Sequence, residues 1–411
     1  MQYKAYKYRI YPTKEQKELL SKTFGCVRYV YNRGLAFKMA LYQTKEKGVS
    51  VFNLMKEMAK WKGCEETKWL KEVNSLALQA SLVNLDRAYT NFFKKRTRFP
   101  KFKSKHDNNQ SFCNPQNTTV FWENGKVCFP KFKEGIKAVL HRDFEGKIKS
   151  STVSRTPSGK YYISVLVEED VKNPAPTRPN ENKTLGIDLG IKDFATFSDG
   201  TILANPKHLS KKLKSLSRQQ RKLSRKNKGG KNRNKQREKV ARLHEKVANC
   251  RKDFLHKITH GLAEKQGYTS LAIENLGVKE MLKNDKKTKL SRSITDAGWG
   301  MFKQFLTYKC ERTGKNLLVI GRFEPSSKLC TCGYLNQNLL LKDREWDCPE
   351  CKKHHKRDEL AAQNIKRFAF CKQNTKKDKI SLPLEWREFT PLESNVSCSL
   401  KKESSTALAQ I

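Results

Sequence analysis

The sequence predicts a multidomain protein that combines an α/β part with an α+β part. From about residue 184 onward, short apolar segments that end on a carboxylate alternate with long amphipathic helices, an order typical of a mixed α/β sheet. Before that point, one strand and a group of hairpin-like segments flank a run of predicted helices. A chain of 411 residues is long enough for two or three such domains.

The chain is strongly basic along its whole length. It has 85 Lys and Arg against 41 Asp and Glu, a formal net charge of +44. Nucleic acid is the expected partner, because such a surplus repels itself unless a polyanion neutralises it. A membrane surface is a weaker explanation, since no apolar run is long enough to span a bilayer and the N-terminus lacks the apolar core of a signal peptide.

The N-terminal residues predict a strand followed by helices. Residues 1–11 alternate aromatic and basic side chains, and Pro12, Thr13 and Gln16 then give the pattern of a helix start with a capping box. A further helix follows Asn74 and leads into residues 93–105, which interleave aromatics with bases. This mixture suits stacking on bases and contact with phosphates, although a helix end with lysines lying over core phenylalanines has the same composition.

Residues 117–169 predict strands only. Asn124 and Gly125 form a hairpin signal, and residues 157–159 separate two further strands. We expect a small barrel or sheet that packs on residues 1–11. The proline-rich segment 171–183 reads as a linker and marks the clearest domain boundary.

Three acids are placed where metal-binding carboxylates would be needed. Asp188 and Glu274 each end a short apolar strand, and Asp358 lies in the first turn of a predicted helix. A buried carboxylate is costly unless it is paired or holds a metal, and two Mg²⁺ ions bridged by carboxylates can hydrolyse a phosphodiester. Each acid alone has a simpler explanation: a turn cap, a solvated strand end, or a partner for the helix dipole.

Residues 207–265 predict a long basic helical hairpin with its tip near residues 228–231. Between residues 207 and 257 there are twenty Lys or Arg and three acids, Glu238, Glu245 and Asp253. A merely solvated helix normally mixes its charges. The bias favours contact with a nucleic-acid backbone.

Four cysteines in two close pairs predict a structural zinc site. They are Cys330, Cys332, Cys348 and Cys351, and four thiolates are a usual ligand set for structural Zn²⁺. The second pair has the usual two-residue spacer, whereas the first has a single residue, Thr331. His354 or His355 is an alternative ligand, and the remaining cysteines indicate a reducing compartment.

The motifs in combination resemble the TnpB family, whose members are encoded by insertion sequences and are related to type V CRISPR nucleases. Residues 188–193, 272–276 and 357–365 resemble the three motifs of a RuvC nuclease, and the likeness covers nearly the whole chain. The short first cysteine pair departs from the family pattern. The order of strands and helices also suits an RNase H-like sheet.

The resemblance implies an RNA-guided endonuclease that cuts double-stranded DNA beside a short target-adjacent motif. The guide would come from the transposon end, and Asp188, Glu274 and Asp358 would hold two Mg²⁺ ions. Base pairing would read the target, while the protein reads duplex shape and the short motif. We expect a monomeric ribonucleoprotein in the prokaryotic cytoplasm, associated with the nucleoid. The expected nucleic-acid contacts are Gln79, Tyr89, Phe92, Lys222, Arg225, Lys226 and Arg357.

The resemblance also implies a domain plan. Residues 1–11 and 117–170 would form a wedge-like β-barrel with a helical recognition domain, 12–116, inserted in it. After the linker, 184–325 and 353–372 would form the RuvC-like domain around a zinc knuckle at 326–352, with a disordered tail at 373–411. A guided repressor without nuclease activity and an accessory transposition factor are the alternatives. All three acids are present, and we find no tyrosine or histidine-pair motif suited to covalent strand transfer.

Overall fold

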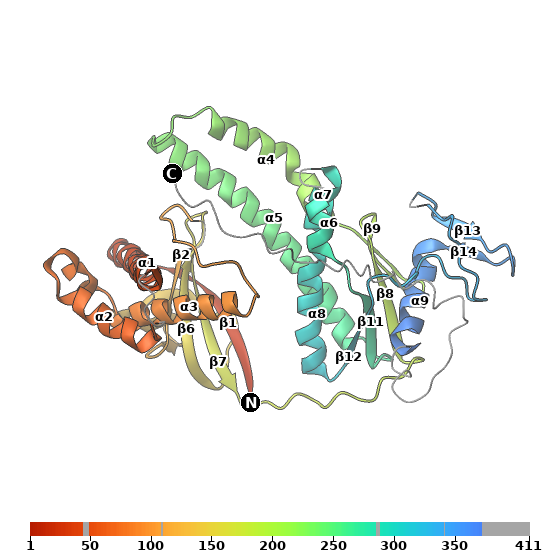
Figure 1. Ribbon diagram of the computed structural model, residues 1–411, viewed down its shortest axis with the longest axis horizontal. Helices are drawn as coiled ribbons and strands as arrows, with labels where there is room; N and C mark the ends of the chain where they lie inside the picture. Colours follow the sequence, from red (N-terminus) through yellow and green to blue (C-terminus); the bar gives the residue numbers. More distant parts are fainter. Residues whose placement is uncertain (44–48, 108–109, 285–287, 341, 372–411) are drawn as a thin grey trace, which may run out of the picture. The chain divides into compact units, whose positions relative to one another are not determined.

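The computed structural model describes residues 1–43, 49–107, 110–284, 288–340 and 342–371, so the tail predicted at 373–411 lies outside the described residues. The chain divides into two compact units (Figure 1). The first contains residues 1–178, 204–267 and 277–316, and the second contains 179–203, 268–276 and the described residues from 317 onward. No helix in the described part of the chain is long and apolar enough to cross a membrane.

The first unit contains a seven-stranded antiparallel sheet with the strand order β2-β6-β7-β1-β5-β4-β3. The predicted strand at residues 1–11 and the predicted strands at 117–169 belong to this sheet, as expected. β2 also joins it, although it lies in the stretch 12–116 that the sequence assigned to helices. The strands are β1 (Gln2–Tyr11), β2 (Gln110–Asn114), β3 (Thr119–Phe121), β4 (Lys126–Phe129), β5 (Phe132–Val139), β6 (Lys147–Arg155) and β7 (Tyr161–Glu169).

Four helical segments follow β1 and share its core: α1 (Lys14–Gln43), α2 (Val51–Gly63), the 3₁₀ segment η1 (Glu65–Glu72) and α3 (Ser75–Phe93). The predicted capping box at the start of α1 is confirmed. The Gln16 backbone N–H donates to Thr13 Oγ1 at 3.3 Å, and the Thr13 N–H donates to Gln16 Oε1 at 3.0 Å. Asn74 caps α3 by accepting from the Leu76 N–H.

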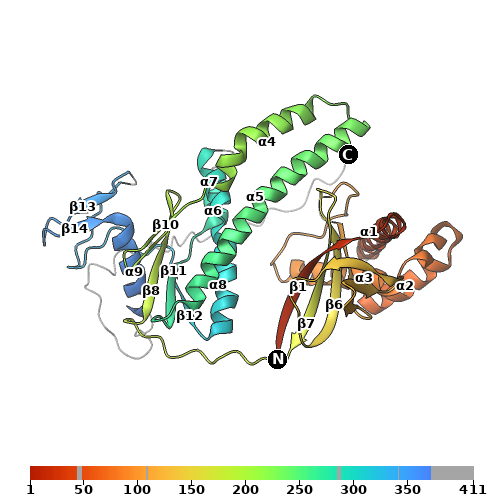
Figure 2. The same cartoon turned by 180° about the vertical axis from the view of Figure 1, so that it is seen from behind.

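The predicted basic hairpin is present in the first unit as α4 (His208–Ser224) and α5 (Lys231–Glu264), which run side by side (Figure 2). Three further helices follow in this unit: α6 (Val278–Asn284), α7 (Lys289–Ala297) and α8 (Trp299–Thr313). Asp296 joins three of the helices, because it accepts from Arg251 Nη2 at 2.7 Å and from the Leu209 backbone N–H at 2.8 Å. Both members of the Arg251–Asp296 ion pair are largely buried.

The hairpin is also tied to the seven-stranded sheet. Glu245 of α5 accepts from Ser158 Oγ at 2.9 Å and from Tyr162 Oη at 3.3 Å, and it lies 2.8 Å from Lys160 Nζ. Burial alone would raise the pKa of Glu245, but these three partners lower it below its ordinary value. One of the three acids in the predicted basic segment is therefore a structural anchor.

The second unit is organised around a five-stranded sheet with the order β10-β9-β8-β11-β12. β8 and β11 are parallel, whereas β8 and β9 are antiparallel, so the sheet is mixed, as predicted. The helix α9 (Arg357–Cys371) packs against β8, β9 and β11. The strands are β8 (Thr184–Leu189), β9 (Asp193–Phe197), β10 (Ile202–Ala204), β11 (Ser270–Glu274) and β12 (Asn316–Ile320), and a separate hairpin comprises β13 (Glu345–Asp347) and β14 (His354–Lys356).

Candidate active site

The first two predicted carboxylates lie on neighbouring strands. β8 and β11 run in parallel with Ile187 opposite Ile273, so Asp188 and Glu274 follow at the same end of the sheet. Leu185 and Ile187 of β8 are fully buried, and Leu271 and Ile273 of β11 are at most 1% exposed. These apolar residues fix the register, because a slip by one position would move them to the opposite face of the sheet. The carboxylates themselves are half-buried.

A glycine brings the third carboxylate to the same place. A Cβ atom at Gly186 would lie 2.0 Å from the backbone oxygen of Ala362 in α9, so the helix backbone rests directly on β8. Gly186 and Asp188 lie two positions apart on the strand and share a face. Asp358 lies one helical turn before Ala362. The close contact at Gly186 therefore places Asp358 beside Asp188.

The electrostatics agree with this arrangement. Burial and the negative charges of Asp358 and Glu274 together raise the pKa of Asp188 to about 7, while Arg357 acts in the opposite direction. Burial also raises the pKa of Glu274. The structure thus brings the carboxylates of Glu274 and Asp358 within range of Asp188.

The chemistry of the three carboxylates decides which metal they could hold. Carboxylate oxygens are the ligands that Mg²⁺ prefers, so the chemistry of this donor set fits that metal.

An arginine that the sequence did not single out lies at this site. Arg344 Nη1 is 3.4 Å from Asp358 Oδ1, and its side chain is half exposed. The backbone oxygen of Arg344 accepts from the Arg357 N–H at 2.8 Å. No local pattern marks Arg344, because it reaches α9 only through the return of the β13–β14 hairpin.

Arg357 itself holds the loop that precedes β13. Its Nη1 donates to the backbone oxygen of Leu340 at 2.8 Å and lies 3.4 Å from that of Asp343. Arg357 therefore ties the start of α9 to this loop. Its predicted contact with a nucleic-acid phosphate stays a prediction.

The four predicted cysteine ligands converge. Their sulfur atoms lie within 4.8 Å of one another, with Sγ separations of 3.5 Å between Cys330 and Cys351 and 3.6 Å between Cys332 and Cys348. Zinc–sulfur bonds of about 2.3 Å in a tetrahedron place the sulfurs roughly 3.8 Å apart. The donor set and its spacing therefore fit a Zn²⁺ ion, despite the one-residue spacer between Cys330 and Cys332.

The two histidines near the cysteines have different surroundings. His355 is buried, and its Nε2 lies 3.0 Å from Cys330 Sγ. Burial would raise the pKa of Cys330, but hydrogen bonds from the Cys332 backbone and from His355 lower it to about 6. His354 lies 2.8 Å from Asp347 Oδ1, so it faces a carboxylate. The four cysteines form the cluster of candidate ligands, and His355 lies against one of them.

The predicted nucleic-acid contacts fall on two elements of the first unit. Gln79, Tyr89 and Phe92 are half-buried positions of α3. At the hairpin tip, Lys222 and Arg225 are exposed, whereas Lys226 is half-buried. Arg233 closes this tip by donating to the Leu223 and Lys226 backbone oxygens, each at 2.7 Å. The roles of all these residues in binding nucleic acid remain predictions.

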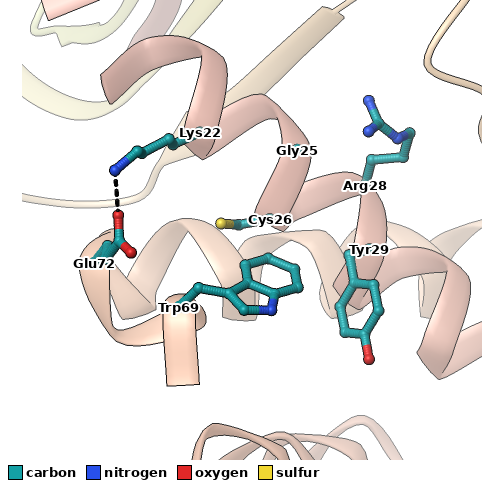
Figure 3. A pocket seen from close by; sticks show the side chains of 7 residues that line it. All are labelled: Lys22, Gly25, Cys26, Arg28, Tyr29, Trp69 and Glu72. Atoms are coloured by element: carbon teal, nitrogen blue, oxygen red, sulfur yellow. Dashed lines mark hydrogen bonds and ion pairs between the residues drawn. The ribbon is translucent and has the colours of Figure 1, made fainter. Parts of the chain in front are cut away.

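A separate hollow of about 340 Å³ opens between α1 and η1 in the first unit (Figure 3). Lys22 and Glu72 form an ion pair of 2.6 Å at one side, and Tyr29 and Trp69 meet edge to face with their centroids 5.0 Å apart. A Cβ atom at Gly25 would meet no atom within 4 Å. The hollow shares no lining residue with the carboxylate or cysteine clusters.

Three family models match parts of the chain. A model described as a probable transposase matches residues 162–285, and one described as a Cas12f1-like TNB domain matches residues 299–365. A third, described as a helix-turn-helix domain, matches residues 1–47. Within that range the structure has β1 followed by the single helix α1.

Two curated relatives align with most of the chain. A protein of Streptomyces pristinaespiralis named "Putative RNA-guided DNA endonuclease" is 40% identical over 365 residues, with 88% of each chain covered. InsQ of Escherichia coli K12, which carries the same description, is 34% identical, with 88% of this chain and 91% of the relative covered.

A solved structure has the same fold. The chain in the cryo-EM structure of a Cas12f1–sgRNA–target DNA complex superposes with a TM-score of 0.54 at 14% sequence identity. The match covers 86% of this chain and 83% of the other. The architecture is therefore Cas12-like and multidomain, with mixed α/β elements.

Proposed function

Because the chain belongs to the TnpB family, we propose that it is an RNA-guided endonuclease that cuts double-stranded DNA beside a short target-adjacent motif. The meeting of Asp188, Glu274 and Asp358 at one end of a sheet supports nuclease chemistry. The names of the relatives with 40% and 34% identity support guidance by RNA and a DNA target. No observation favours the inactive repressor or the accessory transposition factor.

We assign the five-stranded sheet with α9 to an RNase H-like, RuvC-type nuclease domain. Its mixed strand order and the placement of the acids support this assignment. The seven-stranded sheet would be the wedge-like barrel, with α1, α2, η1 and α3 as the inserted recognition helices. Residues 326–352, which contain the four cysteines and β13, would be the zinc knuckle.

Asp188, Glu274 and Asp358 would hold two Mg²⁺ ions. Such ions supply an activated water and neutralise the leaving oxygen during hydrolysis. The protein's own contribution is to fix the three carboxylates: β8 and β11 position two of them in register, and the contact at Gly186 positions the third. Holding these groups rigidly lowers the barrier, because little rearrangement is left for the reaction itself.

Arg344 is placed to contact the DNA backbone at this site. Its guanidinium group lies beside Asp358 and remains half exposed. A guanidinium can hold a phosphate through two hydrogen bonds. We assign Arg344 to the scissile or an adjacent phosphate, with Arg357 holding the knuckle loop against α9.

The zinc would be structural, because four cysteine ligands leave no open position for chemistry. The knuckle carries Arg344 and is tied to α9 through Arg357. A rigid knuckle would therefore keep Arg344 aligned with the carboxylates.

The test begins with the RNA. The protein is expressed together with its native flanking DNA, and the RNA that co-purifies is sequenced. We expect one discrete species with a constant scaffold and an end that matches the flanking sequence. Reprogramming that end should then direct Mg²⁺-dependent cutting of a matching plasmid.

The Asp188→Asn variant is the matched control, because it has the same shape but lacks the charge. It should bind the same RNA and leave the plasmid intact. A random mixture of cellular RNA, or cutting that does not depend on the guide, would refute the guided function. Cutting by Asp188→Asn at the normal rate would remove Asp188 from the mechanism.

A further inference from the structure

The end of α3 carries a cluster of aromatic rings that we call the aromatic platform: Tyr89, Phe92, Phe93 and Phe99. Tyr89 and Phe93 lie nearly parallel with their centroids 6.2 Å apart, and Phe93 also contacts Phe92 at 5.4 Å. Phe99 meets Tyr89 and Phe92 edge-on at 5.6 and 5.3 Å. Tyr89 packs against the hydrophobic core of the first unit, so the platform is built on the fold.

Phe93 is the most exposed member of the platform. Its residue exposure is 71%, against 42% for Phe99, while Tyr89 and Phe92 are half-buried. Phe102 nearby is 55% exposed. A large apolar side chain that is held in a cluster and left open to solvent indicates a binding surface.

The platform is held in a fixed position. Lys95 adopts a left-handed conformation with φ of 56°, and the Arg96 N–H donates to the Asn91 backbone oxygen at 2.9 Å, so the chain turns back at the end of α3. The Asn32 side chain then exchanges two hydrogen bonds with the Lys103 backbone, at 2.8 and 2.9 Å. This clasp ties the returning segment to α1.

All the charged residues of the returning segment, residues 94–105, are basic. It contains no acid, and its bases are Lys94, Lys95, Arg96, Arg98, Lys101, Lys103 and Lys105. The Lys103 ammonium lies over the Tyr31 ring at 4.0 Å. All seven bases are exposed.

We propose that the aromatic platform is a stacking site for an unpaired base of single-stranded DNA, with Phe93 as the stacking ring and the backbone phosphates on the bases of residues 94–105. Aromatic faces next to cations are the usual means of binding single strands, because every unpaired base offers a flat face. In an intact duplex these faces are covered by neighbouring bases, so an exposed ring that stacks on a base favours an unpaired strand. A strand opened during DNA cutting would supply such a base, and in this respect the inference rests on the proposed function.

The test measures binding and stacking separately from cutting. The RNA-loaded, full-length protein is titrated with a fluorescein-labelled single-stranded oligodeoxynucleotide in Mg²⁺-free buffer without a chelator, and 2-aminopurine is placed at one position after another. We expect Phe93→Ala to weaken binding by roughly 5- to 150-fold and to abolish 2-aminopurine quenching at one position. Phe93→Trp should restore both signals, whereas Phe93→Leu should not, because leucine is apolar but has no ring.

Phe52→Ala is the matched control, since Phe52 is 73% exposed but lies in α2 outside the platform. It should bind as the parent does. Arg96→Gln with Arg98→Gln should lower the salt dependence of binding, whereas Phe93→Ala should leave that slope unchanged, because stacking releases no counterions.

Any of four results would overturn the proposal. They are an unchanged affinity in Phe93→Ala, the parental affinity in Phe93→Leu, an equal loss of affinity in Phe52→Ala, and tighter binding of single-stranded RNA than of DNA of the same sequence. The outcome is independent of the guided-nuclease test. Guided cutting with normal single-strand binding by Phe93→Ala would refute the platform alone. Absence of guided cutting together with Phe93-dependent stacking would refute the nuclease function alone.

Discussion

Replacing Gly186 by alanine tests how the active site is assembled. The added Cβ would lie 2.0 Å from the Ala362 oxygen, a contact with backbone that real Cβ atoms do not make below 3.0 Å. β8 and α9 must therefore separate by about 1 Å. A displacement of this size at a catalytic group costs about 100-fold in rate, and the overpacking itself costs about 1–3 kcal/mol of stability.

The assay is single-turnover cutting of a matched plasmid by the guide-loaded protein with Mg²⁺. We expect the rate to fall about 100-fold while target binding remains close to that of the parent, since Gly186→Ala touches no predicted nucleic-acid contact. Thermal unfolding checks that the variant remains folded. Gly25→Ala is the matched control: Gly25 lies in a helix with free space around its Cβ, so this variant should gain up to about 1 kcal/mol and cut normally.

Two results would refute this reasoning. If Gly186→Ala cuts at the parental rate with an unchanged unfolding temperature, α9 does not rest on β8 through this glycine. If target binding falls as far as cutting does, the loss reflects general unfolding and says nothing about the carboxylates.

Three other predictions concern single side chains. Cys348→Ser should lower bound zinc, measured by elemental analysis, together with the unfolding temperature; an unchanged zinc content would exclude Cys348 as a ligand. Arg344→Ala should slow guided cutting by about 10-fold or more, consistent with the loss of a charged hydrogen bond to phosphate, while Arg344→Lys should recover part of the rate; equal rates in both variants and the parent would remove Arg344 from the site. Asp296→Asn should destabilise the first unit by about 3 kcal/mol, because it leaves the largely buried Arg251 without its countercharge. Denaturant unfolding at neutral pH measures this change, and an unchanged free energy of unfolding would show that the Arg251–Asp296 ion pair does not stabilise the unit.

Much of the fold follows from local signals. Three features depend only on residues close in sequence: the capping box at Thr13 and Gln16, the asparagine cap of α3 and the turn at Gly125. Short sequence patterns are therefore enough to predict them. The two carboxylate strands were predictable because each is a short apolar run that ends on an acid, and a buried acid is costly unless it is paired or holds a metal. A mixed sheet was expected, whereas the parallel pairing of β8 with β11 was found only in the structure.

The parts that the sequence did not reveal depend on long-range contacts. Gly186 has an ordinary strand context, and only the approach of Ala362 explains why it has no side chain. Arg344 lies in an irregular segment and meets Asp358 through the hairpin that the cysteines organise. β2 is too short and polar to be separated from the loops around it, and it becomes a strand because β6 offers it an edge.

The distribution of the three carboxylates along the chain also sets an order of events during synthesis. Asp188 and Glu274 emerge from the ribosome well before Asp358. The helix α9 must then pack against β8, which was synthesised much earlier. Domains generally fold as they emerge, N-terminal parts first. The basic hairpin and the aromatic platform are therefore available to nucleic acid while the nuclease centre still lacks its last ligand. The surfaces proposed to bind nucleic acid are thus synthesised before the proposed metal site is complete.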